Sequence, residues 1–202
     1  MSGNRQGTGG GSPSGRPLRA DARRNRAKLL EVARESFATE GLSVPVDEIA
    51  RRAGVGAGTM HRHFPTKESL LEAIVVDHIE LLTGEAGRLA VAADPGEAFF
   101  SFCYGMVERG AANRALAEVL SGVGVGAKAR VAETAEVLDR ALERLLERSQ
   151  EAGAVRGDIG MPELRALLNS VHSVAGRGDG GPDPVARTMA VICDGLRAGA
   201  RG

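Results

Sequence analysis

The sequence predicts an all-α protein, and three observations support this. Hydrophobic residues make up 43% of the chain, yet aromatic residues reach only 3% and Trp is absent. A core built from Ala, Leu and Val favours closely packed helices over a β-sandwich. Apolar residues recur at helical spacing in several segments, and Gly or Pro separates those segments. The 202 residues suffice for one medium domain, or for a small domain joined to a larger one.

The stretch from Pro45 to Phe64 carries the clearest pattern. Its first half predicts a short helix with one apolar face. Gly54 is expected to end that helix, because glycine tolerates the left-handed backbone that closes helices. A second helix is expected to open near Gly56 or Ala57. Two short helices joined by a glycine turn form a helix-turn-helix candidate.

The second of these helices has an apolar face and a basic face. Met60 and Phe64 lie four residues apart, which suits packing onto the first helix. Small residues at the start of the helix let its backbone approach a surface closely. Arg62 can give paired hydrogen bonds to a guanine edge or to a phosphate. The predicted partner is double-stranded DNA, bound in the major groove.

Charge is unevenly distributed, although the formal net charge is zero. Residues 1–70 carry 12 Lys and Arg against 7 Asp and Glu, whereas residues 71–202 carry 14 against 19. The basic excess therefore coincides with the helix-turn-helix, as neutralisation of DNA phosphates requires.

The segment before the helix-turn-helix is also basic. Residues 1–20 are rich in Gly, Ser, Pro and Arg and are predicted to be a disordered arm, which either trails along DNA or has no role. A helix is predicted from Asp21, a plausible N-cap, to Glu40. Arg23 and Arg24 in its first turns are candidates for phosphate contact, with simple solvation as the alternative.

The second helix of the helix-turn-helix is the expected recognition helix. Another helix is expected to follow it, with Thr66 as its N-cap. Its first turn holds Lys67, where the helix dipole disfavours a cation unless a phosphate is bound. A phosphate contact is the functional interpretation of Lys67, and a solvated surface lysine is the alternative.

From Leu29 to Ile74 the sequence resembles the N-terminal DNA-binding domain of the TetR family of bacterial transcriptional regulators. The resemblance rests on A-x-x-x-F, I-A-x-x-A-G-V, G-T-M-H-R-H-F and P-T-K-E-x-L, in that order. It implies a three-helix DNA-binding domain, a fourth linking helix, and a C-terminal helical ligand-binding and dimerisation domain. We accordingly assign residues 1–20 to the arm, 21–66 to the DNA-binding domain with its motif at 45–64, and 67–202 to the C-terminal domain.

The resemblance also assigns roles by position. Positions that usually contact phosphates are occupied by Thr59, His61 and Lys67. Positions that face base edges are occupied by Ala57, Gly58 and Arg62. The family often has larger polar residues at the start of this helix, so base reading is expected to depend more on Arg62 and on DNA shape.

The segment after Pro95 holds four of the six aromatic residues of the chain. They cover more than one face of the expected helix, so some must meet a partner helix or a cavity. Core packing is one interpretation. A pocket for a small apolar ligand, lined by Phe99, Cys103 and Tyr104, is the other. His172 is a candidate ligand contact or a core histidine.

Further helices are expected in the C-terminal half. A short helix around residues 114–120 should precede a long one at 127–152, with the G-V-G-V-G run between them serving as a connection rather than a phosphate loop. Helices at 162–175 and 184–198 carry small residues that suit a four-helix interface across a two-fold axis. A homodimer through these two helices is expected, with packing within one chain as the alternative.

The sequence gives no support for an enzyme, a cofactor or a metal site. It offers no nucleophile with a base, no metal cluster and no paired acids at useful spacing. Cys103 and Cys193 are expected to be two buried apolar thiols rather than a disulfide or a redox pair. No secretory signal is recognised and no apolar run approaches the roughly 20 residues that span a bilayer, so we expect a cytoplasmic protein without a membrane partner.

The leading hypothesis is a TetR-like DNA-binding transcriptional regulator, acting as a ligand-responsive repressor and a homodimer on a double-stranded operator. The alternative is a small-molecule binding protein on the same fold without specific DNA binding, which the bare start of the recognition helix suggests.

Overall fold

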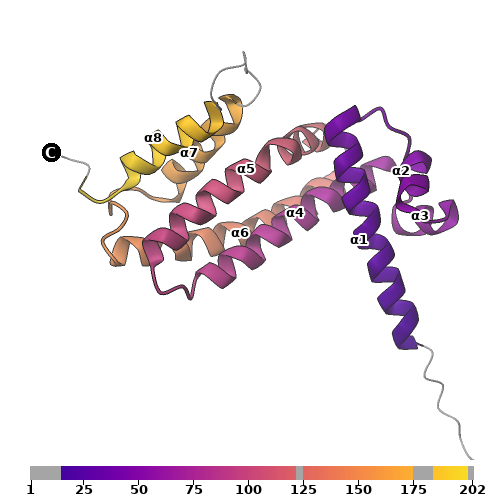
Figure 1. Ribbon diagram of the computed structural model, residues 1–202, viewed down its shortest axis with the longest axis horizontal. Coiled ribbons are helices and arrows are strands. Elements are labelled where there is room, and N and C mark those ends of the chain that lie inside the picture. The colour runs from indigo at the N-terminus through magenta and orange to yellow at the C-terminus, as the bar shows by residue number, and fades with distance from the viewer. Residues whose placement is uncertain (1–14, 122–124, 175–183, 200–202) are drawn as a thin grey trace, which may run out of the picture. The chain divides into compact units, whose positions relative to one another are not determined.

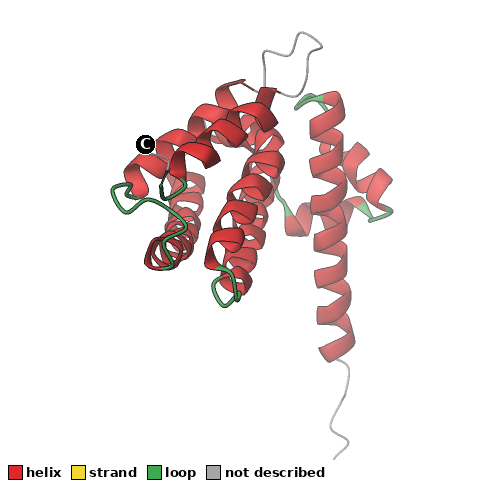
Figure 2. Cartoon of the chain, turned by 60° about the vertical axis from the view of Figure 1, so that its left-hand side comes forward, coloured by secondary structure: helices red, strands yellow, loops and turns green. Residues whose placement is uncertain are grey.

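The computed structural model describes residues 15–121, 125–174 and 184–199, and side chains within 21–109, 129–171 and 184–199. Every regular element drawn in Figure 2 is a helix, which confirms the predicted all-α class. The chain divides into two compact units, Met1–Pro65 and Thr66–Gly202.

The N-terminal unit contains three helices, α1 (Gly15–Glu40), α2 (Val46–Ala53) and α3 (Ala57–His63) (Figure 1). Helix α2 packs against both α1 and α3. The buried apolar side chains of this unit are Leu29, Leu30, Ala33, Phe37, Val44, Ile49, Ala50, Ala53, Met60 and Phe64. The apolar faces predicted for the helix-turn-helix are therefore confirmed.

Helix α1 is longer than predicted. It begins at Gly15, so the expected start at Asp21 is wrong, and Asp21 instead forms an ion pair with Arg24. Pro17 does not prevent the earlier start, because the first-turn N–H groups of a helix have no intrahelical partner to lose. Residues 15–20 of the expected disordered arm are thus helical, while residues 1–14 lie outside the described part of the chain.

The C-terminal unit contains five described helices: α4 (Lys67–Leu89), α5 (Pro95–Ser121), α6 (Val125–Glu151), α7 (Met161–Val174) and α8 (Pro184–Leu196). Helices α4, α5 and α6 pack against one another, and α5 also contacts the α7–α8 pair (Figure 1). One apolar core joins them, with Phe99, Phe102, Leu145 and Leu164 among its fully buried members. None of the helices in the described ranges is long and apolar enough to cross a membrane.

Two helices continue through glycines that lie within their bounds. Helix α4 continues through Gly84 and Gly87, because Ala86 between them is completely buried and its packing outweighs the cost of about 1 kcal/mol for each glycine. Helix α5 is continuous to Ser121, so the separate helix expected at 114–120 is its last part. Alanines in that part favour continuation.

The turn between α6 and α7 lies where the sequence predicted it. The side-chain amide of Gln150 donates to the carbonyls of Arg156 and Ile159, at 3.0 and 2.8 Å. An isolated antiparallel bridge joins Val155 to Arg197, just past α8. The turn therefore fixes the end of the last helix onto the rest of the C-terminal unit.

Candidate nucleic-acid interface

The turn of the helix-turn-helix is set by Gly54. Its φ of 65° and ψ of 30° lie in the left-handed region, and its N–H donates to carbonyls of α2, ending that helix. The N–H of Val55 then donates to the carbonyl of Ala50 at 3.0 Å. This geometry confirms the predicted glycine stop and leads directly to the start of α3 at Ala57.

The recognition helix α3 buries one face and exposes the other. Met60 has no exposed surface and anchors the helix on the core. Gly58 and Arg62, one turn apart on the opposite face, are both exposed, as is Ala57. The Nε of Arg62 donates to the carbonyl oxygen of Gly58 at 3.1 Å, so the guanidinium lies along the helix surface. The exposed face of α3 therefore has small side chains at its start, Ala57 and Gly58, and a basic side chain, Arg62, near its end.

His61 has a partner within the motif. Its Nε2 lies 3.4 Å from a carboxylate oxygen of Asp47, in the first turn of α2, and the two side chains are 56% and 75% exposed. A phosphate contact by His61 would therefore compete with Asp47. Thr59 is half-buried, and His63 packs against the ring of Phe64 with centroids 6.1 Å apart.

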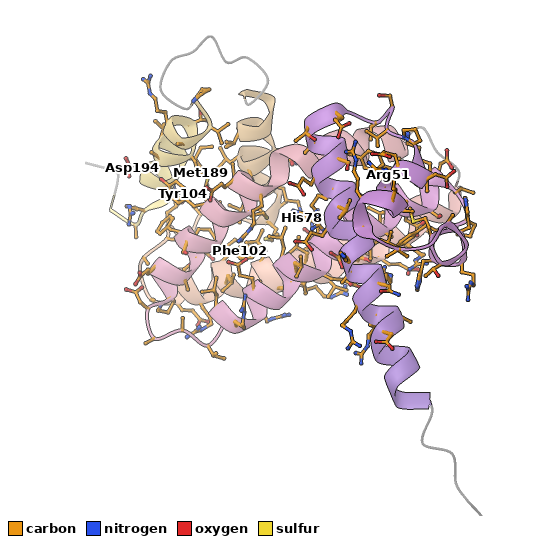
Figure 3. The ribbon with its side chains drawn as sticks, turned by 45° about the vertical axis from the view of Figure 1, so that its right-hand side comes forward. Arg51, His78, Phe102, Tyr104, Met189 and Asp194 are labelled. Atoms are coloured by element: carbon orange, nitrogen blue, oxygen red, sulfur yellow. The ribbon has the colours of Figure 1, made fainter. Side chains whose placement is uncertain are left out.

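A network of ion pairs holds α2 on α1. Arg52 pairs with Glu48 on its own helix and with Glu40 on α1, and it also donates to the hydroxyl of Ser36 at 3.1 Å. Arg51, labelled in Figure 3, binds Glu48 through two nitrogens at 2.7 and 2.8 Å. These hydrogen bonds from Arg51 and Arg52 lower the pKa of Glu48 to about 2.

This network was not predicted from the sequence. Its signal was the spacing of Glu48 before Arg51 and Arg52, at three and four residues, which pairs opposite charges on a helix surface. The cross-helix partner Glu40 had no comparable signal, because its distance of twelve residues carries no periodic meaning.

The arginines of α1 have different environments. Arg23 and Arg24 are exposed, and Arg24 is paired with Asp21. The guanidinium of Arg26 lies over the ring of Phe64, 5.9 Å from its centroid. Arg26 therefore connects α1 to the residue that ends the recognition helix.

Lys67 is the first residue of α4 and is half-buried. The predicted cap is confirmed, because the Thr66 side chain accepts from the N–H of Ser69 at 3.1 Å and the Ser69 hydroxyl accepts from the N–H of Thr66 at 3.1 Å. Lys67 thus sits at an ordered helix start in the C-terminal unit.

Three of the candidate pocket residues lie on α5. Phe99 and Cys103 have no exposed surface and belong to the apolar core, whereas Tyr104 is 40% exposed. The side chains of Tyr104 and of Cys193, on α8, lie close enough to affect each other's pKa through a hydrogen bond. Figure 3 shows Tyr104 with Met189 and Asp194, where α5 meets α8. The side chain of His172 lies outside the described residues.

The two thiols are free and buried, as predicted. Burial, and secondarily the nearby Cys193, raises the pKa of the Cys103 thiol. Burial also raises the pKa of Cys193, opposed by its hydrogen bond with Tyr104. Among the described residues, no group of three or more His, Cys, Asp or Glu side chains could hold a metal ion.

Two cavities of the C-terminal unit lie on other surfaces. One of about 330 Å³, between α4 and α6, is lined by Glu80, Thr83, Glu133, Thr134 and Val137. The other, of about 470 Å³, lies along α8 and is lined by Pro184, Arg187, Thr188, Ala190 and Val191.

A glycine turn, a buried anchor and an exposed basic helix face define a helix-turn-helix DNA-binding protein. Residues 29–74 match the family model described as bacterial regulatory proteins of the tetR family. Residues 94–198 match the model for the SbtR-like C-terminal domain of transcriptional regulators. The chain belongs to the TetR family of transcriptional regulators, in which repression, ligand response and homodimers are typical.

Solved structures agree with this assignment. A TetR transcription regulatory protein from Mycobacterium vanbaalenii is 44% identical, with a TM-score of 0.73 over 90% of this chain and 99% of that one. A TetR regulator from Streptomyces coelicolor is 28% identical, with a TM-score of 0.71 over 87% and 99%. An HTH-type transcriptional regulator of Staphylococcus aureus is 32% identical over 65 residues, which cover 32% of this chain but only 35% of that relative.

Proposed function

We propose that the protein is a ligand-responsive repressor that binds an operator as a homodimer. The two recognition helices would enter successive major grooves, about 34 to 36 Å apart. A ligand in the C-terminal unit would favour a spacing that no longer fits, and it can do so only through different affinities for the two shapes. Because the target is chromosomal DNA, the proposed place of action is the cytoplasm.

One observation carries the DNA-binding proposal: the exposed face of α3 lies opposite the buried anchor Met60. Ala57 and Gly58 leave the helix backbone uncovered, so it can approach base edges closely. Arg62 is the long donor on that face, and its planar guanidinium suits the paired acceptors of guanine. Arg62 is therefore the proposed base-reading residue.

The remaining candidates are proposed as phosphate contacts, which fix position on the duplex without reading sequence. Thr59 and His61 lie on α3 itself, and Arg23 and Arg24 are exposed on α1. Lys67 joins them because the positive end of the helix dipole at the start of α4 favours a phosphate there. For His61 and Arg24 the phosphate would replace a carboxylate partner, Asp47 and Asp21 respectively.

The proposed dimer interface consists of the helices predicted at 162–175 and 184–198, here α7 and α8. Val191 is 72% exposed on α8, within the cavity along that helix. An apolar side chain of this kind gains stability if a second copy covers it. The small residues along both helices permit the close approach that a four-helix interface needs.

The proposed ligand site is the edge of the core at Tyr104. The half-exposed ring of Tyr104 lies next to the buried Cys103, and Phe99 is one turn away on the same helix. A small apolar molecule that displaced Tyr104 would reach these side chains, and a contact from His172 is proposed with them.

Selection from a random DNA pool tests the proposed function. The wild type should enrich a two-fold symmetric sequence. Arg62→Ala should lose preference at one base pair in each half-site, because a good paired contact contributes about 1 to 3 kcal/mol of discrimination. The matched control is Arg51→Ala, an exposed arginine of α2 that binds Glu48 and should keep the selected sequence.

An unchanged selection by Arg62→Ala would show that another group reads the bases. Failure of the wild type to enrich any sequence, at any salt concentration, would favour the small-molecule binding protein instead.

A further inference from the structure

A third cavity of the C-terminal unit lies where the chain leaves α8. It has a volume of about 540 Å³, and its walls come from the start of α5, from the turn after α6 and from the residues that follow α8. Figure 1 shows these three segments at the same end of the C-terminal unit. Tyr104 and Cys103 are not among its lining residues, so this cavity is separate from the proposed apolar ligand site.

Backbone contacts hold the walls of this cavity together. The N–H of Arg156 donates to the carbonyl of Leu196 at 3.0 Å. The N–H of Ala198 likewise donates to the carbonyl of Ala154 at 3.1 Å. Gly96 lies against the same turn, because a Cβ added to it would come within 2.6 Å of the Cβ of Ala154. The cavity is therefore formed before a ligand binds, which lowers the cost of binding.

Arg197 is the one cation among the residues that line the cavity. Its guanidinium lies 4.5 Å from the centroid of the Phe100 ring, and this cation–π contact holds the planar group in place. Its ion pair with Asp194 has an N–O distance of 3.8 Å, which is too long for a hydrogen bond. The guanidinium thus keeps N–H donors for a ligand, and its fork matches the two oxygens of a carboxylate.

Two carboxylates line another wall of the same cavity. Asp94 directly precedes α5, and Glu97 lies in the first turn of that helix. One oxygen of Asp94 accepts the N–H of Glu97 at 2.9 Å, whereas the side chain of Glu97 is exposed. Within the described part of the chain, neither carboxylate forms an ion pair with Arg197 or with another cation. A cation and two anions therefore line one cavity without pairing with each other.

We propose that this cavity binds a small zwitterion, an amino acid or a short peptide. The carboxylate of the ligand accepts paired hydrogen bonds from Arg197, and its ammonium group donates to Glu97, with Asp94 as a second negative charge. Ligands of a single charge are disfavoured, because an anion meets the two carboxylates and a cation meets Arg197. The site goes beyond the proposed function, because it lies apart from the proposed apolar site and its occupation requires no DNA.

The first test measures stabilisation of the full-length protein by ligands. The probes are the common L-amino acids at millimolar concentration, together with diglycine and triglycine, which place the two charges progressively farther apart. A ligand that binds only the folded protein raises its melting temperature by mass action, so at least one probe should do so. The proposal is overturned if none of the probes raises the melting temperature.

Variants then locate the bound probe by isothermal titration calorimetry. Arg197→Gln and Glu97→Gln should each raise its dissociation constant by about tenfold or more, because each removes a charge-assisted hydrogen bond. The matched controls are Arg144→Gln and Glu143→Gln, which remove exposed charges of α6 and should leave the constant unchanged. Glu97→Gln remains informative if Arg197→Gln disturbs folding, because Glu97 is exposed. Unchanged binding in the Arg197 and Glu97 variants would place the probe elsewhere and overturn the proposal.

Blocked forms of the bound probe test its two charges separately. The N-acetylated form lacks the ammonium group, and the amidated form lacks the carboxylate. Each should bind the wild type more weakly than the zwitterion does. Equally tight binding of the N-acetylated form would reject a zwitterion in favour of a simple carboxylate at Arg197. Because none of these measurements involves DNA, failure of the proposed operator binding would leave their outcome unaffected.

Discussion

The two units of the molecule are stabilised in different ways. The N-terminal unit has a small core, and its helix-turn-helix also depends on a left-handed glycine and on ion pairs that hold α2 to α1. The C-terminal unit depends on one larger apolar core, in which Phe99, Phe102 and Leu164 are completely buried. A turn that requires glycine leaves a specific residue in the sequence, whereas an apolar core accepts many combinations of side chains. The fold of the N-terminal unit can therefore be predicted from individual residues of the sequence, whereas the fold of the C-terminal unit is predicted mainly from its pattern of helices.

The largest expected effect lies in the C-terminal core. Phe102→Ala should lower the free energy of unfolding by about 3 to 5 kcal/mol, because it leaves a cavity among packed side chains. Urea unfolding followed by circular dichroism measures this. Val91→Ala is the control, since Val91 is 83% exposed and its truncation should change stability by no more than about 0.5 kcal/mol.

A loss of less than about 1 kcal/mol for Phe102→Ala would contradict tight packing around α5, given what such truncations usually cost. The core would then have space beside its aromatic residues, which would strengthen the case for a ligand pocket there. The C-terminal unit would then depend less on a tightly packed core, and the two units would differ less in how they are stabilised.

The next effect concerns the turn of the helix-turn-helix. Gly54→Ala should destabilise the N-terminal unit by about 1 to 2 kcal/mol, because an alanine at φ 65° brings its Cβ too close to the following carbonyl. Gly58→Ala is the matched control within the same motif. Its backbone is helical and a Cβ there has open space, so it should stabilise α3 by about 0.5 to 1 kcal/mol.

The two glycines should differ again when DNA is added. Gly58→Ala should weaken operator binding despite its higher melting temperature, since the added methyl group lies on the exposed face of α3. A Gly54→Ala protein as stable as the wild type would show that the turn does not depend on its left-handed residue.

The fold of the helix-turn-helix could be predicted because each of its requirements has a local signal. Gly54 marks the turn, Met60 and Phe64 mark the packed face, and Thr66 marks the next helix start. The residues of α3 that lie on its exposed face followed from the same spacing. Their roles toward DNA remain proposals, because the bases that they meet are not part of this chain.

Other features had no local signal. The continuation of α4 through Gly84 and Gly87 depends on burial against helices far along the sequence, which outweighs helix propensity. The start of α1 at Gly15 could not be deduced from apolar periodicity, because Leu18 is the only large aliphatic residue between Gly15 and Leu29. The partners of Arg52 on α1 and of Tyr104 on α8 likewise arise from tertiary packing.

The smallest expected effect tests the ion pairs of the N-terminal unit through pH. The pKa of Glu48 is lowered from 4.5 to about 2 by hydrogen bonds from Arg51 and then Arg52. A carboxyl group whose pKa is lower in the folded state stabilises that state above its unfolded pKa, and the contribution is lost as the pH falls through the folded value. Wild type should therefore be slightly more stable than Glu48→Gln at pH 6, and the difference should shrink as the pH falls from about 4.5 to about 2.

The effect should be small and should decrease with added salt, because the carboxylate and both arginines are partly exposed to solvent. Thermal unfolding at several pH values measures it. Glu136→Gln is the control, since Glu136 faces Arg140 at 3.8 Å on an exposed surface of α6 and should show little pH-dependent difference. If both glutamine variants gave the same pH dependence, the network would contribute no more than an isolated surface pair, and the N-terminal unit would depend on its core and its glycine turn alone.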